Sequence, residues 1–319
     1  MNVELLINHE NKLFVPAVLE GITWRTERKN YPGTLAFSVI ADDNSPITEG
    51  DAVRLTVDNN NVFYGFVFTI KHDKNNTVSV TAYDQLRYLK NKDTYVYENK
   101  TAGEVVSMIA ADFRLKTGDI ENTGFKIASR VESDQTLFDI IQNALDLTLQ
   151  STKQMFVLFD DFGKLSLKSI KNMRNNIVID ENSAENYDYS SSIDTDTYNK
   201  VKLTFDNDDT GTRDVYIAQS GGNINKWGVL QYYDTLKKGE NGQAKADALL
   251  NLYNSETRGL SIKNAFGDNS IRAGCLVPVM LDLGDVKVKN YMLVEKCKHE
   301  FKNNSHFMDL DLRGGEFIA

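Results

Sequence analysis

Cysteine, proline and histidine are scarce in this chain, and long apolar runs are missing. Its 319 residues include two cysteines, four prolines and four histidines. Two cysteines are too few for the disulfide framework of a small secreted domain, so we expect Cys275 and Cys297 to be reduced thiols on neighbouring strands. No apolar run reaches the length that spans a bilayer, so membrane insertion is not expected. The start, Met1 to Leu5, lacks the basic and apolar regions of a signal peptide, which predicts synthesis in the cytoplasm.

Positive charge is also in short supply. The formal net charge is -9, and the lysines and arginines are scattered rather than gathered in a run that could follow phosphates. Nucleic-acid binders normally carry a basic stripe, so stable nucleic-acid binding is not expected. The composition is otherwise that of a globular protein, with 41% hydrophobic residues. A chain of this length is expected to bury a real core over two or three domains.

The residue patterns that usually carry catalysis or metal binding are weak. None of the histidines lies in an HExxH pattern, and no P-loop, dinucleotide fingerprint or G-x-S-x-G elbow is present. The segment Asp206–Gly211 resembles half of a calcium loop, but the twelfth position is Ile217, so a polar hairpin turn is predicted. The segment Ser220–Asn223 is predicted to be a loop. Asp160 and Asp161 are expected at a hairpin tip, with no buried cleft to perturb their pKa values. We therefore expect no enzyme, cofactor or metal site.

A pattern that occurs twice is the most informative feature that is present. The first copy begins with Gly50-Asp51-Ala52-Val53-Arg54-Leu55-Thr56-Val57-Asp58, and the second with Gly274-Cys275-Leu276-Val277-Pro278-Val279-Met280-Leu281-Asp282. Each has a glycine, alternating apolar residues and an aspartate, the pattern of a half-buried strand. Further equivalent positions follow downstream. The predicted structural anchors of the two copies are Gly50, Val53, Leu55, Tyr64 and His72, and Gly274, Val277, Val279, Tyr291 and His299. Because His72 and His299 are equivalent, they are interpreted as structural twins rather than catalytic residues.

The fold class expected from these patterns is α+β, mostly β. Residues 1–90 and 199–319 are predicted to form two tube-like β-barrels, the second with one inserted helix near 243–255. Residues 91–170 are predicted to form an inserted α/β domain, and residues 171–198, rich in Asn, Asp and Ser, a connection. Five or six strands are expected in the first barrel, with Trp24 as a core anchor.

Two helices are predicted inside the α/β segment. Thr101-Ala102-Gly103-Glu104 has the form of a capping box, and apolar residues at helical spacing follow it. A second helix is expected to start near Ser133 or Asp134. A hairpin with its turn at Asp160–Gly163 is predicted to follow.

Two stretches resemble a known family. The run Val78-Ser79-Val80-Thr81-Ala82-Tyr83-Asp84-Gln85-Leu86-Arg87-Tyr88-Leu89, and later Trp227-Gly228-Val229-Leu230-Gln231-Tyr232-Tyr233 before a helix and the Gly274 strand, resemble XkdQ/YqbQ-type tail proteins of the Bacillus prophage PBSX. Such proteins resemble the trimeric baseplate hub of contractile-tail phages and phage-tail-like bacteriocins. The resemblance implies a homotrimer whose six barrels form a ring between the hexameric tail tube and the trimeric spike, with baseplate wedge proteins as further partners. It also implies assembly into the baseplate after synthesis in the bacterial cytoplasm.

Two other functions remain open from the sequence. A peptidoglycan-binding or wall-cleaving module could act through the middle α/β segment, whose helix after Thr101 slightly resembles LysM-like units. A metal-dependent enzyme is the third hypothesis. Since the sequence ends at Ala319, directly after the second expected barrel, a hydrolase is expected to be a separate protein. A ring needs each subunit to present matching edges, and two similar barrels per chain would let a threefold object imitate sixfold symmetry.

Overall fold

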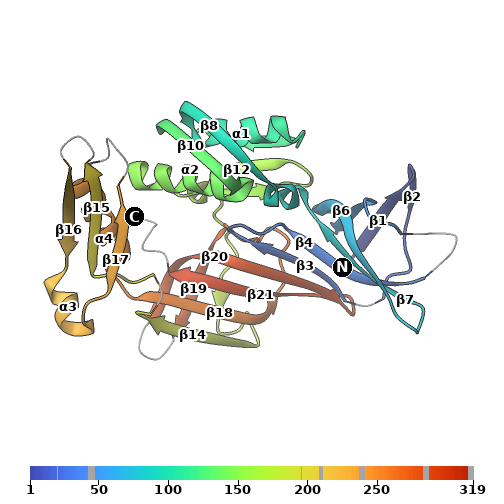
Figure 1. Ribbon diagram of the computed structural model, residues 1–319. Coiled ribbons are helices and arrows are strands. Elements are labelled where there is room, and N and C mark those ends of the chain that lie inside the picture. Colours follow the sequence, from blue (N-terminus) through green and yellow to red (C-terminus); the bar gives the residue numbers. More distant parts are fainter. Residues whose placement is uncertain are drawn as a thin grey trace. The chain divides into compact units, whose positions relative to one another are not determined.

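The computed structural model describes residues 1–19, 21–41, 47–194, 196–207, 211–236, 241–282 and 287–314. Its contacts divide the chain into two compact units. Unit 1 comprises Met1–Asp188 and Leu260–Ala319, and unit 2 comprises Tyr189–Gly259. Strands dominate both units, with a few helices, so the predicted α+β, mostly β class is confirmed (Figure 1).

The N-terminal part of unit 1 is an antiparallel sheet. Two hairpins, β3–β4 and β6–β7, form its centre, because β4 pairs with β7, while β5 pairs with both β6 and β1. Alternate side chains of these strands fill one core that includes the almost fully buried Trp24, as predicted. Among the described residues up to Tyr83, seven strands are present rather than the five or six expected: β1 Val3–His9, β2 Lys12–Phe14, β3 Ile22–Glu27, β4 Thr34–Ile40, β5 Ala52–Val57, β6 Asn60–His72 and β7 Thr77–Tyr83.

The C-terminal strands continue the same sheet. β20 pairs with β19 and β21, and its second half also pairs with β3 of the N-terminal strands. The strand order is β14-β18-β21-β20-β3-β4-β7-β6-β5-β1-β2, an open path, so closure of each half into a barrel stays a prediction. The strands are β13 Ile179–Asp180, β14 Asn186–Ser192, β18 Thr257–Phe266, β19 Leu276–Asp282, β20 Lys287–Lys302 and β21 Ser305–Gly314. The expected connection 171–198 thus contains two of these strands.

The middle segment follows a short 3-10 helix, η1 (Gln85–Lys90), and combines two helices with two small sheets. The predicted capping box is present, because Thr101 Oγ1 accepts from Glu104 N while Glu104 Oε2 accepts from Thr101 N. The second helix begins at Leu137 rather than near Ser133, because Thr136 is its N-cap and the preceding residues belong to a strand. The elements are β8 Lys92–Thr101, α1 Ala102–Asp112, β9 Thr117–Ile120, β10 Lys126–Thr136, α2 Leu137–Thr152, β11 Phe156–Asp160, β12 Leu165–Ser169 and η2 Ile170–Asn172.

Besides the end of β14 and the start of β18, unit 2 contains a three-stranded sheet on which helix α4 packs. Its core consists of apolar side chains from β15, β16 and α4 together with Leu236, which follows β17. The prediction of a loop at Ser220–Asn223 was wrong, because these residues start a short helix whose last turn is closed by Gly228 at φ +78°. The elements are β15 Lys200–Asn207, β16 Thr212–Gln219, α3 Gly221–Trp227, β17 Gln231–Thr235 and α4 Gly242–Tyr253.

Candidate functional site

The two glycine-started copies adopt the same backbone geometry. Gly50 and Gly274 both have φ +94°, a conformation that other residues rarely adopt. Gly50 N donates to Val67 O at 2.8 Å, and Gly274 N donates to Val294 O at 2.8 Å. In each copy the valine N donates in return to the carbonyl of the residue after the glycine, at 2.9 Å. The glycines therefore start equivalent turns into equivalent strands.

The strand register repeats as well. Val53 lies opposite Gly65 in the first copy, and Val277 lies opposite Met292 in the second. A bulge follows the valine that receives the glycine hydrogen bond in both copies. Of the predicted anchors, five are fully buried: Val53, Leu55, Val277, Val279 and His299. The repeat seen in the sequence is thus a repeated three-stranded unit, β5–β6–β7 and β19–β20–β21.

The two tyrosine anchors contact the chain beyond the repeated strands. The Tyr64 ring lies 5.8 Å from the Phe162 ring in the β11–β12 turn, and a Cβ on Gly163 would lie 2.6 Å from Tyr64 Cδ1. The Arg174 guanidinium lies 5.2 Å from the centre of the Tyr291 ring. Both tyrosines therefore sit where a repeated unit meets a neighbouring segment.

His72 and His299 share a ladder position but not an environment. His72 lies opposite Val78, and His299 lies opposite Met308; the offset is 227 residues on the first strand and 230 on its partner, because the second hairpin is three residues longer. His72 is exposed, whereas His299 is fully buried, stacks on Trp24 at 4.7 Å and bonds with His306 at 2.8 Å. Burial lowers the pKa of His299 to about 3. The environments differ because β3 covers the second copy at this point.

Candidate metal and catalytic groups do not converge. Across the residues that the structure describes, no group of three or more His, Cys, Asp or Glu side chains could hold a metal ion. His9 contacts Asp51 through Nδ1 at 3.0 Å, and Thr48 Oγ1 approaches the same nitrogen, so these contacts do not set up a proton relay across the ring. In the segment that resembles a calcium loop, residues 208–210 lie outside the described residues, and the Asp206 carboxylate is paired with Arg213. Both cysteines are buried free thiols.

A buried carboxylate pair lies where three segments of unit 1 meet. Asp84 follows β7 and accepts hydrogen bonds from Gly33 N and Leu86 N, while Asp160 ends β11 and accepts from Gly163 N. Burial raises the pKa of Asp160 to about 6, and burial together with the Asp160 charge raises the pKa of Asp84. The expectation that Asp160 lacks a buried environment was wrong. Its side chain points inward at the end of the strand, while Asp161 is exposed.

An arginine compensates this pair from the segment before β19. Arg272 Nη1 donates to Asp160 O at 2.8 Å, and its guanidinium lies 4.4 Å from the centre of the Phe159 ring. Gln85 bridges the same place, since its Nε2 donates to Asp160 Oδ2 and its Oε1 accepts from Lys116 N. The arrangement joins the first copy, the α/β segment and the start of the second copy. It forms a structural junction between these three segments.

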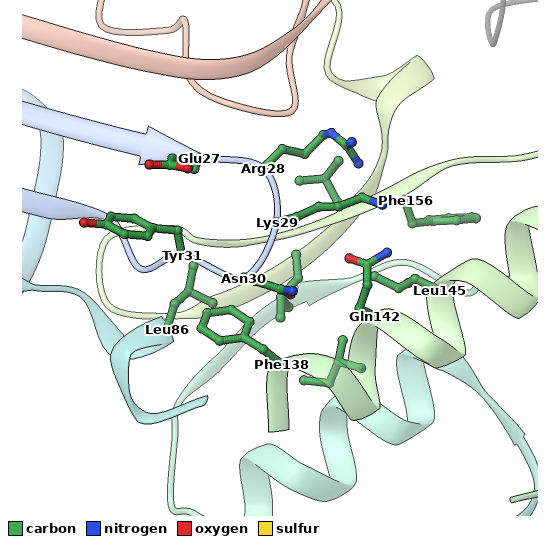
Figure 2. A pocket seen from close by; sticks show the side chains of 13 residues that line it. Glu27, Arg28, Lys29, Asn30, Tyr31, Leu86, Phe138, Gln142, Leu145 and Phe156 are labelled. Atoms are coloured by element: carbon green, nitrogen blue, oxygen red, sulfur yellow. The ribbon is translucent and has the colours of Figure 1, made fainter. Parts of the chain in front are cut away.

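A small pocket in unit 1 lies between the β3–β4 turn, α2 and β11. Figure 2 shows Lys29 reaching across it toward Gln142 and Phe156, with Leu86 and Phe138 on another side. Burial lowers the pKa of Lys29, against the opposing effect of Asp146, whose Oδ1 lies 3.9 Å from Nζ. The neighbouring Arg28 makes a two-pronged ion pair with Glu295 of β20, at 2.7 and 2.9 Å. The charged groups at this pocket are thus engaged in ion pairs that hold the turn in place.

Comparison with known proteins gives the family. The model of the YQBQ-like family matches residues 22–313. This chain belongs to the YQBQ-like family. It is 31% identical to the uncharacterized protein YqbQ of Bacillus subtilis and 30% identical to the phage-like element PBSX protein XkdQ of the same organism, in each case over 97% of this chain and 96% of the relative. The family predicted from residues 78–89 and 227–233 is therefore confirmed.

Solved structures of low sequence identity share the fold of this YQBQ-like chain. The 43 kDa tail protein of prophage MuSo2 from Shewanella oneidensis matches with a TM-score of 0.75 at 12% identity, covering 99% of this chain and all of that one. The prophage tail protein gp18 from Listeria monocytogenes matches with a TM-score of 0.63 at 11% identity, over 98% and 95% of the chains. A type VI secretion component from Escherichia coli, c3393, matches with a TM-score of 0.59 at 8% identity, over 99% and 78%. No helix of the described residues is long and apolar enough to cross a membrane.

Proposed function

We propose that this protein is the structural hub of a baseplate in a contractile phage tail or a phage-tail-like particle. Three chains would form a ring of six equivalent units, which joins a hexameric tail tube to a trimeric spike and is surrounded by wedge proteins. The observation that carries the proposal is the pair of repeated units, whose glycine turns, bulges and ladder register coincide within one chain. Two copies per chain turn threefold symmetry into approximate sixfold symmetry.

The relatives support a role in a tail. XkdQ belongs to a phage-like element, and the structures with the same fold include two prophage tail proteins and a type VI secretion component described as similar to bacteriophage tail proteins. A structural role also agrees with how the polar groups are used, since the buried carboxylates and Arg28 join chain segments to one another. We therefore propose that the protein is not an enzyme.

The net charge supports passage of DNA or another polyanion through such a ring. A formal charge of -9 per chain gives a negative field that repels phosphates rather than retaining them. Negative charge around the opening would favour release of a polyanion in transit. The same charge disfavours stable nucleic-acid binding by the isolated protein.

The assembly state in solution tests the proposal. Native mass spectrometry over a concentration series should show a species of about three times the chain mass of 36.0 kDa, and addition of tube or spike protein should shift it further. A protein that stays monomeric at high concentration and joins neither partner would refute the hub. Incubation with purified peptidoglycan addresses the alternative, a wall-binding or wall-cleaving module that acts through residues 91–170. Retention on the wall, or loss of turbidity, would favour that function instead.

A further inference from the structure

The second repeated unit has a neighbour that the first one lacks. In β20, the first half pairs with β19, and the second half, from Lys296 to Phe301, pairs on that same side with β3. The other side of this second half pairs with β21. Both sides of β20 are therefore hydrogen-bonded, and the His299 ring is covered by Trp24 of β3.

In the first repeated unit, β5–β6–β7, the side of β6 that corresponds to the β3-paired side of β20 is open. Its first half pairs with β5 up to Phe66, and its second half, Phe66 to His72, pairs with β7. Along the described residues, no strand pairs with the remaining side of Thr69–His72, which is the position that β3 occupies on β20. An open strand side carries N–H and C=O groups ready to accept another strand. The exposure of His72 follows from this missing neighbour.

A strand equivalent to β3 also exists in the half of the sheet that contains the second repeated unit. Leu19 N donates to Ser38 O just before β3, and Glu185 N donates to Lys263 O just before β14. A second hydrogen bond repeats in the same way, from Ile40 N to Ala17 O and from Phe266 N to Ser183 O. The offset is 166 residues in both cases, from Leu19 to Glu185 and from Ala17 to Ser183. The strand β14 therefore corresponds to β3, and it is the terminal strand of the sheet beside β18.

We propose that the open side of β6 in one chain binds β14 of a second copy of this chain as an antiparallel strand. This inference rests on the proposed function, whose ring it closes. The β20–β3 register predicts the pairing: His299 lies opposite Trp24, so His72 should lie opposite Ser190 of the neighbouring chain. Lys71 should then lie opposite Ser191, as Lys298 lies opposite Arg25.

The occupant is a second copy because one chain carries both surfaces of the proposed contact, the open side of β6 and the terminal strand β14. The chain already makes this strand pair once, between its own repeated halves, and it leaves one open β6 side and one terminal β14. Such a head-to-tail contact between different surfaces forms a ring when its rotation closes. Strand addition supplies main-chain hydrogen bonds, and the alternating side chains set the register.

Cysteine cross-linking tests the register. The double variant His72→Cys with Ser190→Cys should give covalent dimers and trimers on mild oxidation, because opposite residues on antiparallel strands come within disulfide reach. Each single variant should give none, and both native cysteines are buried. The matched control, Lys71→Cys with Ser190→Cys, places the thiols on opposite faces of the sheet and should cross-link at least tenfold less. Equal cross-linking of the two pairs, or none, in a protein that is trimeric by native mass would overturn the strand pairing and leave the hub intact.

Hydrogen exchange of the unmodified protein provides a measurement that needs no variant. Amides in Thr69–His72 that face the open side should become protected as the oligomer forms, on raising the protein concentration, whereas those of β20 should be protected throughout. Fast exchange of Thr69–His72 in the trimer would overturn the pairing. A chain that never forms a trimer would overturn both the pairing and the hub.

Discussion

The buried Asp160 predicts an unusual pH dependence of stability. The residue is 6% exposed, and burial raises the pKa of its carboxyl from 3.8 to about 6. The folded chain therefore holds a proton on Asp160 over a pH range in which the unfolded chain has lost it. The contribution of this group to stability is full below pH 4 and is lost as the pH rises through 6. A shift of this size corresponds to about 3 kcal/mol, at about 1.4 kcal/mol per pKa unit.

The variant Asp160→Asn removes this titration. The free energy of unfolding is measured by urea titration between pH 4 and 7.5 in both proteins, because the buried His299, whose pKa is lowered, also contributes to the pH dependence and only the difference isolates Asp160. Across this range, the free energy of unfolding of the variant should rise by about 3 kcal/mol relative to that of the natural protein. The absolute difference includes the loss of one accepted hydrogen bond, from Gln85, so the change with pH is the informative quantity.

The matched control is Asp161→Asn, since Asp161 is the next residue and is exposed. Its stability curve should run parallel to that of the natural protein. Parallel curves for Asp160→Asn would refute the reasoning, because they would mean that Asp160 ionises equally easily in the folded and unfolded chains. If the variant instead lost stability relative to the natural protein as the pH rises, the attraction of Arg272 for the Asp160 carboxylate would outweigh the effect of burial.

Three further predictions concern how the repeated units are held. Gly274→Ala should destabilise the protein more than Gly50→Ala in thermal unfolding. Both changes incur about 1 to 2 kcal/mol of backbone strain at φ +94°. A Cβ on Gly274 would also lie 2.6 Å from a methyl group of β11, whereas a Cβ on Gly50 would face open space. Equal losses would contradict this close approach of β11 to Gly274. Arg28→Ala should lower the free energy of unfolding by about 3 kcal/mol, because the Arg28 side chain is 7% exposed and its loss leaves Glu295 without its two-pronged partner. The double variant Arg28→Ala with Glu295→Ala should lose less stability than the sum of the two single changes. Additive losses would argue against the pair. Thr101→Ala should cost about 1 kcal/mol by removing the N-cap of α1, with Thr101→Ser nearly neutral; a similar loss in both would exclude a capping effect.

Local sequence patterns predicted the parts of the fold that depend on local chemistry. Gly50 and Gly274 marked equivalent turns because only glycine adopts φ +94° easily, and Thr101 marked a helix start because its hydroxyl satisfies an exposed amide. The start of the second helix was misplaced, since Ser133 and Asp134 also have capping chemistry but are used in a strand. The Ser220–Asn223 segment was misjudged because glycines usually disfavour a helix.

Contacts between distant segments were out of reach of these patterns. The pairing of β20 with β3 joins residues more than 250 apart, and no local signal distinguishes His299, which this pairing buries, from the exposed His72. The junction around Asp160 was missed for the same reason, because its burial depends on Gln85 and Arg272 from other segments. One local signal was present. Successive side chains of a strand point to opposite faces, so two adjacent aspartates at the end of β11 cannot both point to solvent, and one of them is expected to point inward.

The proposed hub requires three chains to form a ring of six equivalent units. Electron micrographs of the purified oligomer, averaged in views down its axis, test it most directly. The expected image is a closed ring with six similar densities around an opening, alternating between two kinds and repeating every third of a turn. A ring with any other number of units, or a particle without an opening, would contradict it.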